Sequence, residues 1–211
     1  MAEGIRGTDG YAAEAADLLV RYEAISFAEA HSDILHLLPE APGLALDIGS
    51  GTGRDAAHLA GLGHRVVAVE PTDSMRIGAA RLHPSNLIEW IDDGLPDLAR
   101  LAGRKATFDL VMMTAVWMHL DAADRRRAMP VVGSLLRPGG TMIMTLRHGP
   151  VPAGRRMFEV SVEETVALAR DARLSPVFDH HWISLREPNK SAGVTWTRLA
   201  FSKVHESDGR E

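Results

Sequence analysis

The segment that decides the fold is Leu44-Ala45-Leu46-Asp47-Ile48-Gly49-Ser50-Gly51-Thr52-Gly53. A short apolar run is closed by an acidic residue, and three glycines then alternate with small polar residues. The run predicts a buried strand, and residues 54–60 predict a helix that follows at once. Glycine permits a sharp turn and lets a ligand approach the backbone. Because free N–H groups at a helix start favour negative or polar ligand groups, the turn predicts a nucleotide-like ligand.

The glycine spacing distinguishes between nucleotide sites. The dinucleotide fingerprint G-x-G-x-x-G/A needs a small third residue, but counting from Gly49 places Arg54 there, which disfavours a nicotinamide oxidoreductase. No P-loop lysine follows. The pattern D-x-G-x-G-x-G resembles the first motif of class I S-adenosylmethionine-dependent methyltransferases. The resemblance implies S-adenosyl-L-methionine as cofactor, with S-adenosyl-L-homocysteine as product, bound by Asp47, Gly49, Ser50, Gly51 and Gly53, and by Arg54 at the cofactor's carboxylate.

A second predicted strand, residues 65–69, leads to Glu70 and Pro71. A carboxylate at a strand tip can accept two hydrogen bonds from ribose hydroxyls, and the resemblance implies this role for Glu70. The alternative is a solvated carboxylate that ends the strand. The next helix begins near Met75, where the family often places an apolar residue against adenine. A methionine that fills the core is the alternative.

The third predicted strand, residues 87–91, runs into Asp92-Asp93-Gly94-Leu95-Pro96. This segment resembles the family's D-x-x-L-P motif, whose acidic residue accepts a hydrogen bond from the adenine amino group. The resemblance implies that Asp92 or Asp93 has this role, with Asp92 preferred. An Asx-type turn before Gly94 is the alternative, and it is compatible with the first role.

The fourth predicted strand, residues 108–116, is almost entirely apolar, as expected of a central parallel strand covered on both faces. With the V-W-M-H-L sequence that follows, it resembles the family's fourth motif. That resemblance implies that backbone groups near Thr114 and Ala115 face the methionine end of the cofactor. A further family hallmark, an L-x-P-G-G turn over residues 136–140, precedes a fifth strand at residues 141–146.

The predicted fold is α/β: a Rossmann-like, doubly wound, seven-stranded, mostly parallel sheet with an antiparallel last strand and N-terminal helices. One domain has three parts. Residues 1–43 hold helices at 11–25 and 27–38 that cover the cofactor and substrate side, and residues 44–147 form the S-adenosylmethionine-binding half. Residues 148–211 supply a substrate-side loop, a helix and a hairpin of strands 175–184 and 195–203.

Composition excludes several classes of protein. The 211 residues carry a net charge of −5 and no cysteine, which excludes disulfides, thiolate zinc sites and a cysteine nucleophile. The sequence contains no block of Lys or Arg, so nucleic acid is not expected as a partner. It contains no apolar run of about 18 residues, so a membrane partner is not expected either. No secretory signal is visible, so a cytoplasmic location is expected. His180 and His181 point to opposite faces of a strand, and no metal is predicted.

Two histidines follow strands at positions where a base can accept a proton from the methyl acceptor: His148 and His119. His119 has the alternative of organising its turn. The resemblance also suggests a pocket for a small-molecule substrate, lined by Tyr11, Tyr22, Trp117 and Arg147; for the tyrosines the alternative is a helix packed on the sheet. Arg147 and the nearby Arg155 and Arg156 suit an anionic substrate, with surface charge as the alternative.

The expected function is therefore methyl transfer from S-adenosylmethionine to an O, N or S atom of a small molecule. The alternative is a non-catalytic S-adenosylmethionine-binding sensor or partner subunit, which would lack an open acceptor pocket. The sequence does not predict the acceptor or the oligomeric state.

Overall fold

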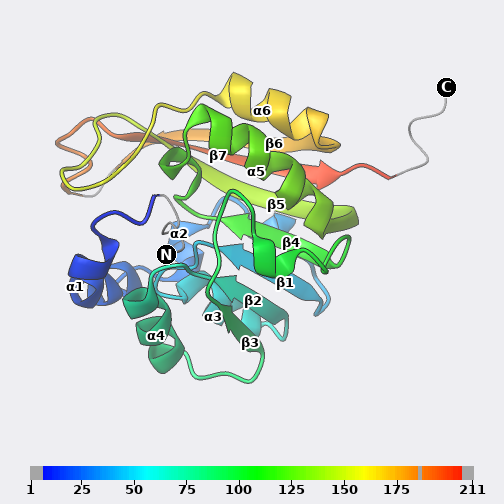
Figure 1. Cartoon of the computed structure of the whole chain (residues 1–211), viewed down its shortest axis with the longest axis horizontal. Helices are drawn as coiled ribbons and strands as arrows, with labels where there is room; N and C mark the ends of the chain where they lie inside the picture. Colours follow the sequence, from blue (N-terminus) through cyan, green and yellow to red (C-terminus); the bar gives the residue numbers. More distant parts are fainter. Residues whose placement is uncertain (1–6, 185–186, 206–211) are drawn as a thin grey trace.

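The computed structural model describes residues 7–184 and 187–205, which form a seven-stranded sheet between layers of helices (Figure 1). The strand order is β3-β2-β1-β4-β5-β7-β6. Strands β1 to β5 are parallel to one another, and β7 is antiparallel to both of its neighbours, β5 and β6. The strands are β1 (Leu44–Ile48), β2 (Arg65–Val69), β3 (Ile88–Ile91), β4 (Phe108–Met113), β5 (Leu136–His148), β6 (Leu174–Ile183) and β7 (Thr195–Lys203). The predicted fold class is confirmed.

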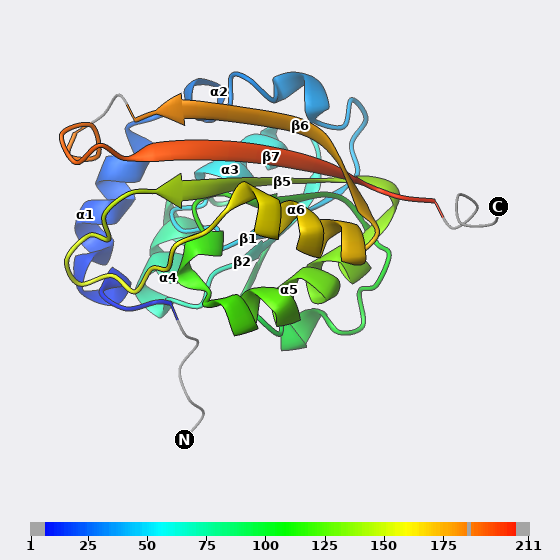
Figure 2. The ribbon, with the colours of Figure 1, turned by 90° about the horizontal axis from the view of Figure 1, so that it is seen from above.

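Helices cover both faces of the sheet (Figure 2). They are α1 (Tyr11–Glu23), α2 (Phe27–Ala30), α3 (Arg54–Gly61), α4 (Asp73–Leu82), α5 (Ala122–Leu135) and α6 (Val162–Asp171), with short 3-10 turns η1 (Leu35–Leu37), η2 (Ala99–Leu101) and η3 (Trp117–His119). The larger core cluster packs α5 and α6 on one face, through residues such as Met144 and Val132. A second cluster packs α2 and α3 on the other face, through residues such as Ile143 and Leu59.

The order of the strands fixes where a ligand binds. The chain builds outward from β1 to β3 and then returns to place β4 on the other side of β1. In such a sheet, ligands bind beyond the carboxyl ends of the strands where the order reverses, here between β1 and β4. Helix α1 and the loop before α6 lie at that edge, on the left of Figures 1 and 2.

The predicted helix over residues 27–38 is wrong in its length. Helix α2 stops at Ala30 after a capping box between Ser26 and Glu29, and η1 begins only at Leu35. His31, between them, is turned inward to a buried partner, and Asp33 pairs with Arg198 of β7. These long-range contacts outweigh the local helical pattern.

The predicted start of the fifth strand is also wrong. Strand β5 begins at Leu136, because Leu136 already pairs with Phe108 of β4. The expected turn is an irregularity inside the strand: the register shifts before Thr141 pairs with Leu110, and Gly139 adopts a φ of +75°. No described helix is long and apolar enough to cross a membrane. The two ends of the predicted domain, residues 1–6 and 206–211, lie outside the described residues.

Candidate functional site

The glycine turn between β1 and α3 has a backbone conformation that residues other than glycine rarely adopt. Gly49, Gly51 and Gly53 have φ angles of +67°, +56° and +82°. A Cβ at Gly49 would lie 2.6 Å from a methyl group of Val116, and one at Gly53 would lie 2.5 Å from the ring of Trp90. A Cβ at Gly51 would meet only the Gly49 carbonyl, at 4.0 Å. The turn is packed at its two ends, and open in front of its central glycine.

Glu70 binds this turn directly. Its Oε2 accepts a hydrogen bond from the Gly51 N–H (3.0 Å), and its Oε1 accepts one from the Thr72 N–H (2.8 Å), with Pro71 between the two. The side chain is buried, which raises the pKa of Glu70, while the two N–H donors oppose that shift. The Thr72 side chain also makes a hydrogen bond with this carboxylate, which has about four lone-pair sites, so an acceptor position remains for a ligand hydroxyl.

Two buried oxygens beside the turn have no hydrogen-bond partner among the described residues: Oδ2 of Asp47 and Oγ of Ser50. Burial, together with the neighbouring Asp55, raises the pKa of Asp47 well above its usual value. Buried polar atoms are normally hydrogen-bonded, and orphaned ones at an open turn indicate a polar ligand. A ligand with ribose hydroxyls and an ammonium group, as in S-adenosylmethionine, fits these groups.

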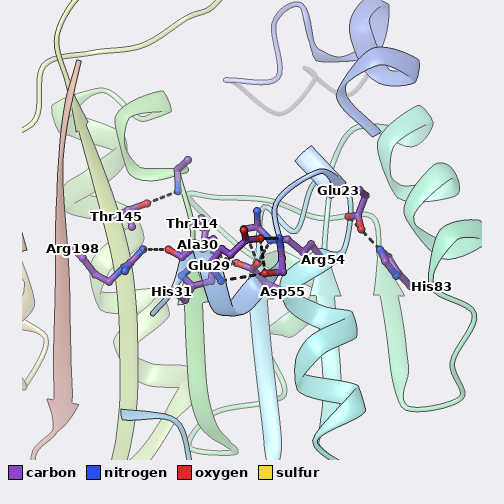
Figure 3. A network of polar contacts seen from close by, with 12 residues as sticks. Glu23, Glu29, Ala30, His31, Arg54, Asp55, His83, Thr114, Thr145 and Arg198 are labelled. Carbon is purple, nitrogen blue, oxygen red and sulfur yellow. Dashed lines mark hydrogen bonds and ion pairs between the residues drawn. The ribbon is translucent and has the colours of Figure 1, made fainter. Parts of the chain in front are cut away.

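Asp55 is the centre of a buried polar network (Figure 3). Its Oδ2 accepts hydrogen bonds from His31 Nε2 (2.9 Å) and Thr114 Oγ1 (2.8 Å), and its Oδ1 accepts one from Arg54 Nε (2.8 Å). Burial alone would raise the pKa of Asp55, but these hydrogen bonds and charges hold it far below its usual value. The ionised carboxylate thus joins α2, α3 and the end of β4.

This network changes how two predicted cofactor residues are used. The Arg54 guanidinium pairs with Asp55, and the Thr114 hydroxyl is also bound to Asp55. Ala115 has a φ of +59°, and its N–H donates to Thr145 Oγ1 at 2.8 Å. A non-glycine residue in the left-handed region marks a constrained turn, here at the carboxyl end of β4. Their contacts with a cofactor remain predictions.

The two adjacent aspartates after β3 have different surroundings. Asp93 is buried, and its carboxylate accepts hydrogen bonds from the N–H groups of Gly94 (2.9 Å) and Arg100 (2.7 Å). Asp92 is exposed, and its carboxylate accepts a hydrogen bond from the Arg76 guanidinium, at 3.3 Å. Asp93 therefore fixes the backbone of the segment that follows β3, and Asp92 is the more exposed of the two carboxylates.

Met75 packs between helices. It is fully buried, in a small cluster with Ala15 and Leu18 of α1. The structure supports the alternative of a core-filling methionine, because this cluster is what holds α1 against α4.

Tyr11 and His119, predicted separately as substrate-lining residue and base, lie together. Tyr11 Oη is 3.0 Å from His119 Nε2, and His119 Nδ1 is 2.8 Å from the Arg156 carbonyl oxygen. A carbonyl only accepts, so Nδ1 carries the proton and Nε2 accepts the hydrogen bond from the Tyr11 hydroxyl. Burial raises the pKa of Tyr11 to about 12 and lowers the pKa of His119, so both side chains are neutral at pH 7.

Arg155, in the loop before α6, packs against the Tyr11 ring of this pair. Its guanidinium lies 4.3 Å from the centre of the Tyr11 ring and makes two hydrogen bonds with the Glu14 carboxylate, at 3.0 and 2.8 Å. The surface-charge alternative is therefore wrong for Arg155, because the side chain is almost fully buried. Arg156, which pairs with Asp121 at 3.4 Å, is more exposed.

His148 is the last residue of β5. Its Nε2 is 2.9 Å from Thr197 Oγ1, and the backbone of Val160 makes a further hydrogen bond with the ring. Burial lowers the pKa of His148, and the neighbouring His181, which also contacts Thr197, adds to the shift. The contacts give this histidine the structural alternative of fixing the loop before α6.

The remaining substrate candidates are spread out. Trp117 has no exposed surface, belongs to the main core cluster and has an unpaired indole N–H. Tyr22 is exposed on α1, with Arg21 over its ring. Arg147 is buried at the end of β5, where its guanidinium donates to the Pro150 carbonyl at 2.8 Å.

Sequence reasoning missed His31, Asp55 and Thr145. Asp55 lies in the first turn of a helix, where an acidic residue is ordinary. His31 lies 24 positions from its partner Asp55, and Thr145 lies 30 from Ala115, so no local pattern identifies either contact. The one signal in the sequence was the position of Asp55, two residues after the last glycine of the turn.

Together, the strand order, the glycine turn with its carboxylate and the open carboxyl edge define a nucleotide-binding α/β fold of the class I methyltransferase type. The family model described as "Methyltransferase domain" matches residues 46–144. Residues 46–144 thus carry a methyltransferase domain, and the predicted resemblance to class I S-adenosylmethionine-dependent methyltransferases is confirmed.

Curated relatives align with about half of the chain. A ubiquinone biosynthesis O-methyltransferase from Methylocella silvestris is 41% identical over 98 residues, covering 46% of this chain and 37% of the relative. An uncharacterized methyltransferase from Mycobacterium tuberculosis is 32% identical over 113 residues, covering 50% and 40%. The chain thus matches about two fifths of the length of these relatives.

Solved structures show the same fold over most of the chain. A 1,6-didemethyltoxoflavin-N1-methyltransferase from Burkholderia thailandensis, with S-adenosylhomocysteine bound, has a TM-score of 0.71 at 22% identity, covering 92% of this chain and 86% of that one. A putative S-adenosylmethionine-dependent methyltransferase from Listeria monocytogenes has a TM-score of 0.68 at 13% identity, covering 82% and 97%. Within the described ranges, no three His, Cys, Asp or Glu side chains are placed to hold a metal ion.

Proposed function

We propose that this protein transfers a methyl group from S-adenosylmethionine to an O, N or S atom of a small molecule. The observation that carries the proposal is the hydrogen bond from the Gly51 N–H to Glu70 Oε2, 3.0 Å long. It places a carboxylate with a spare acceptor position beside the open centre of the glycine turn. The unpaired oxygens of Asp47 and Ser50 add two more polar groups at the same place.

Each part of the site has a proposed task. Glu70 binds the ribose hydroxyls, Asp92 the adenine amino group, and the region of Asp47 and Ser50 the polar end of the cofactor. S-adenosylmethionine supplies an activated methyl group when bound. The chain then has to align an acceptor beyond the ends of β4 and β5 and exclude water. We assign this task to α1 and the loop before α6, which lie at that edge.

A base is needed only where the acceptor carries a proton at working pH. We propose His119 for this task, acting through Tyr11. The Tyr11 hydroxyl passes its proton to Nε2 of His119 as it takes one from the acceptor. His148 remains the alternative base, although its ring already contacts Thr197 and Val160.

The acceptor class is supported by the relatives. One is named for O-methylation in ubiquinone biosynthesis and another for N1-methylation of 1,6-didemethyltoxoflavin, both small molecules. A chain without a block of basic residues fits such acceptors better than nucleic acid.

The test is calorimetric titration of S-adenosylhomocysteine into the protein and two variants. Glu70→Gln removes the charge that accepts ribose hydrogen bonds and should weaken binding by about 1–3 kcal/mol. Glu89→Gln is the matched control, since Glu89 is an exposed glutamate of β3 that pairs with Arg104. Equal affinity for all three proteins rejects the ribose assignment, and no binding to the unchanged protein rejects the proposed function.

Turnover separates the enzyme from the non-catalytic alternative. The protein is incubated with labelled S-adenosylmethionine and a panel of small phenols, amines and thiols, and S-adenosylhomocysteine is measured. Methyl transfer to any member supports the enzyme. Tight cofactor binding with no transfer to any of them favours a sensor or partner subunit.

A further inference from the structure

Arg147 is a buried cation without an acidic partner in the described part of the chain. The residue is 8% exposed, and its guanidinium donates hydrogen bonds to the neutral oxygens of Pro150, at 2.8 Å, and Asn189, at 3.5 Å. Other arginine side chains that are as deeply buried each have a carboxylate. The pairs are Arg125 with Glu164, Arg155 with Glu14 and Arg198 with Asp33.

A buried charge is costly unless it is paired. Burial lowers the pKa of Arg147, the direction expected of a guanidinium that has lost water without gaining a counter-ion. Glu14 pairs with Arg155 and therefore provides no counter-ion for Arg147. The structure therefore leaves one uncompensated positive charge at this point.

The charge borders a cavity of about 390 Å³ at the end of β5. The walls include the apolar side chains of Met118, Met157, Phe158 and Val160, and the polar side chains of His148 and Glu159 also line the cavity. Glu159 is exposed to solvent. Small-molecule sites commonly combine an apolar cavity of this size with a few placed polar groups. An occupant with an apolar body and one negative group matches both features.

The cavity adjoins the proposed proton-transfer pair. Met118, which lines it, directly precedes His119. The charge of Arg147 contributes to lowering the pKa of His119, and Tyr11 acts electrostatically on Arg147. An anion on Arg147 would thus be held within electrostatic reach of the Tyr11 hydroxyl.

We infer that the methyl acceptor is a small carboxylic acid with an apolar body, whose carboxylate pairs with the Arg147 guanidinium. The planar guanidinium matches a carboxylate through two parallel hydrogen bonds. This inference rests on the proposed function, and it names the substrate class for that same site.

The binding experiment uses matched acids and amides on the protein saturated with S-adenosylhomocysteine. The probes are benzoate, phenylacetate and 4-hydroxybenzoate, each beside its neutral amide, titrated with detection by NMR. At least one acid should bind about tenfold more tightly than its amide, and Arg147→Met should abolish that preference. Arg126→Met, at an exposed arginine of α5, should keep it.

Each other result is decisive. If no acid binds, if acids and amides bind alike, or if Arg147→Met keeps the preference, the inference is overturned. Failure of the proposed function has a different signature, because it would appear as loss of S-adenosylhomocysteine binding in the unchanged protein. A phosphate monoester, phenyl phosphate, that outcompetes every acid would overturn the carboxylate assignment.

Thermal unfolding without ligand separates a binding role from a structural one. Removing an unpaired buried cation relieves a cost, so Arg147→Met should unfold at an equal or higher temperature than the unchanged protein. Arg125→Met should unfold at a lower temperature, because it leaves Glu164 without its partner. A comparable loss in both variants would show that Arg147 serves the fold and would overturn the inference.

Discussion

The Tyr11 hydroxyl donates a hydrogen bond to Nε2 of His119, 3.0 Å away and 108 positions along the chain. The contact joins the first helix to the turn after β4, at the edge where the carboxyl ends of the parallel strands meet. The Arg156 carbonyl fixes the histidine tautomer from the other side. These two hydrogen bonds thus connect three segments that the sequence keeps far apart, and they give the proposed base a defined protonation state.

Replacing Tyr11 with Phe should slow methyl transfer about 100-fold for a protonated acceptor, because the proton path to His119 is lost. The affinity for S-adenosylhomocysteine should stay unchanged, since the ring and its packing remain. Single-turnover rates and calorimetry measure the two effects. A Tyr11→Phe enzyme at full rate would contradict the proposed path.

The pH dependence of kcat/KM should report His119. Neutral imidazole is the proton acceptor, and burial moves the pKa of His119 below its usual 6.5. The rate should therefore be flat from pH 7 upward and fall as pH decreases, with its midpoint below 6.5. The acceptor chosen for the profile must not titrate in this range.

Paired variants decide between the two histidines. His119→Gln should remove the acid limb of the profile and lower the rate, while His148→Gln should keep the limb. The reverse pattern would transfer the role to His148, whose pKa is also lowered by burial.

The two aspartates after β3 should respond differently to replacement. Asp92→Ala should weaken S-adenosylhomocysteine binding, because it removes the acceptor, and should leave the free energy of unfolding nearly unchanged, because the Asp92 side chain is exposed. Asp93→Ala should lower the free energy of unfolding by about 1–3 kcal/mol, because two backbone donors lose their acceptor. Urea unfolding and calorimetry on both variants give the comparison. Equal cofactor affinity in Asp92→Ala would refute the adenine assignment.

Gly53→Ala should destabilise the protein, since its φ of +82° disfavours a side chain and its Cβ would lie 2.5 Å from Trp90. We expect a loss of about 1–3 kcal/mol in the free energy of unfolding. Gly61→Ala is the control: a Cβ there meets nothing within 4 Å, and alanine favours the helix by up to about 1 kcal/mol. If urea unfolding gave equal changes for both, the glycine turn would not be constrained as described.

Much of the cofactor half could be predicted because its signals are local. The glycine turn, the β-branched strand before Glu70 and the apolar strand β4 each act over a few neighbouring residues, where conformational preference and periodicity are readable. The predicted helix over residues 27–38 failed because His31 and Asp33 bind partners on other elements, and those contacts outweigh local preference.

The sequence by itself determined the type of fold, the glycine turn and the acidic residues that follow β2 and β3. Only the tertiary structure decided which polar groups meet: Tyr11 with His119, Asp55 with Thr114, and Arg147 with no carboxylate among the described residues. The physical reason is that hydrogen bonds and ion pairs form between atoms a few ångströms apart, whereas sequence patterns report only on neighbours along the chain. Distances across the folded sheet become defined once the core has packed.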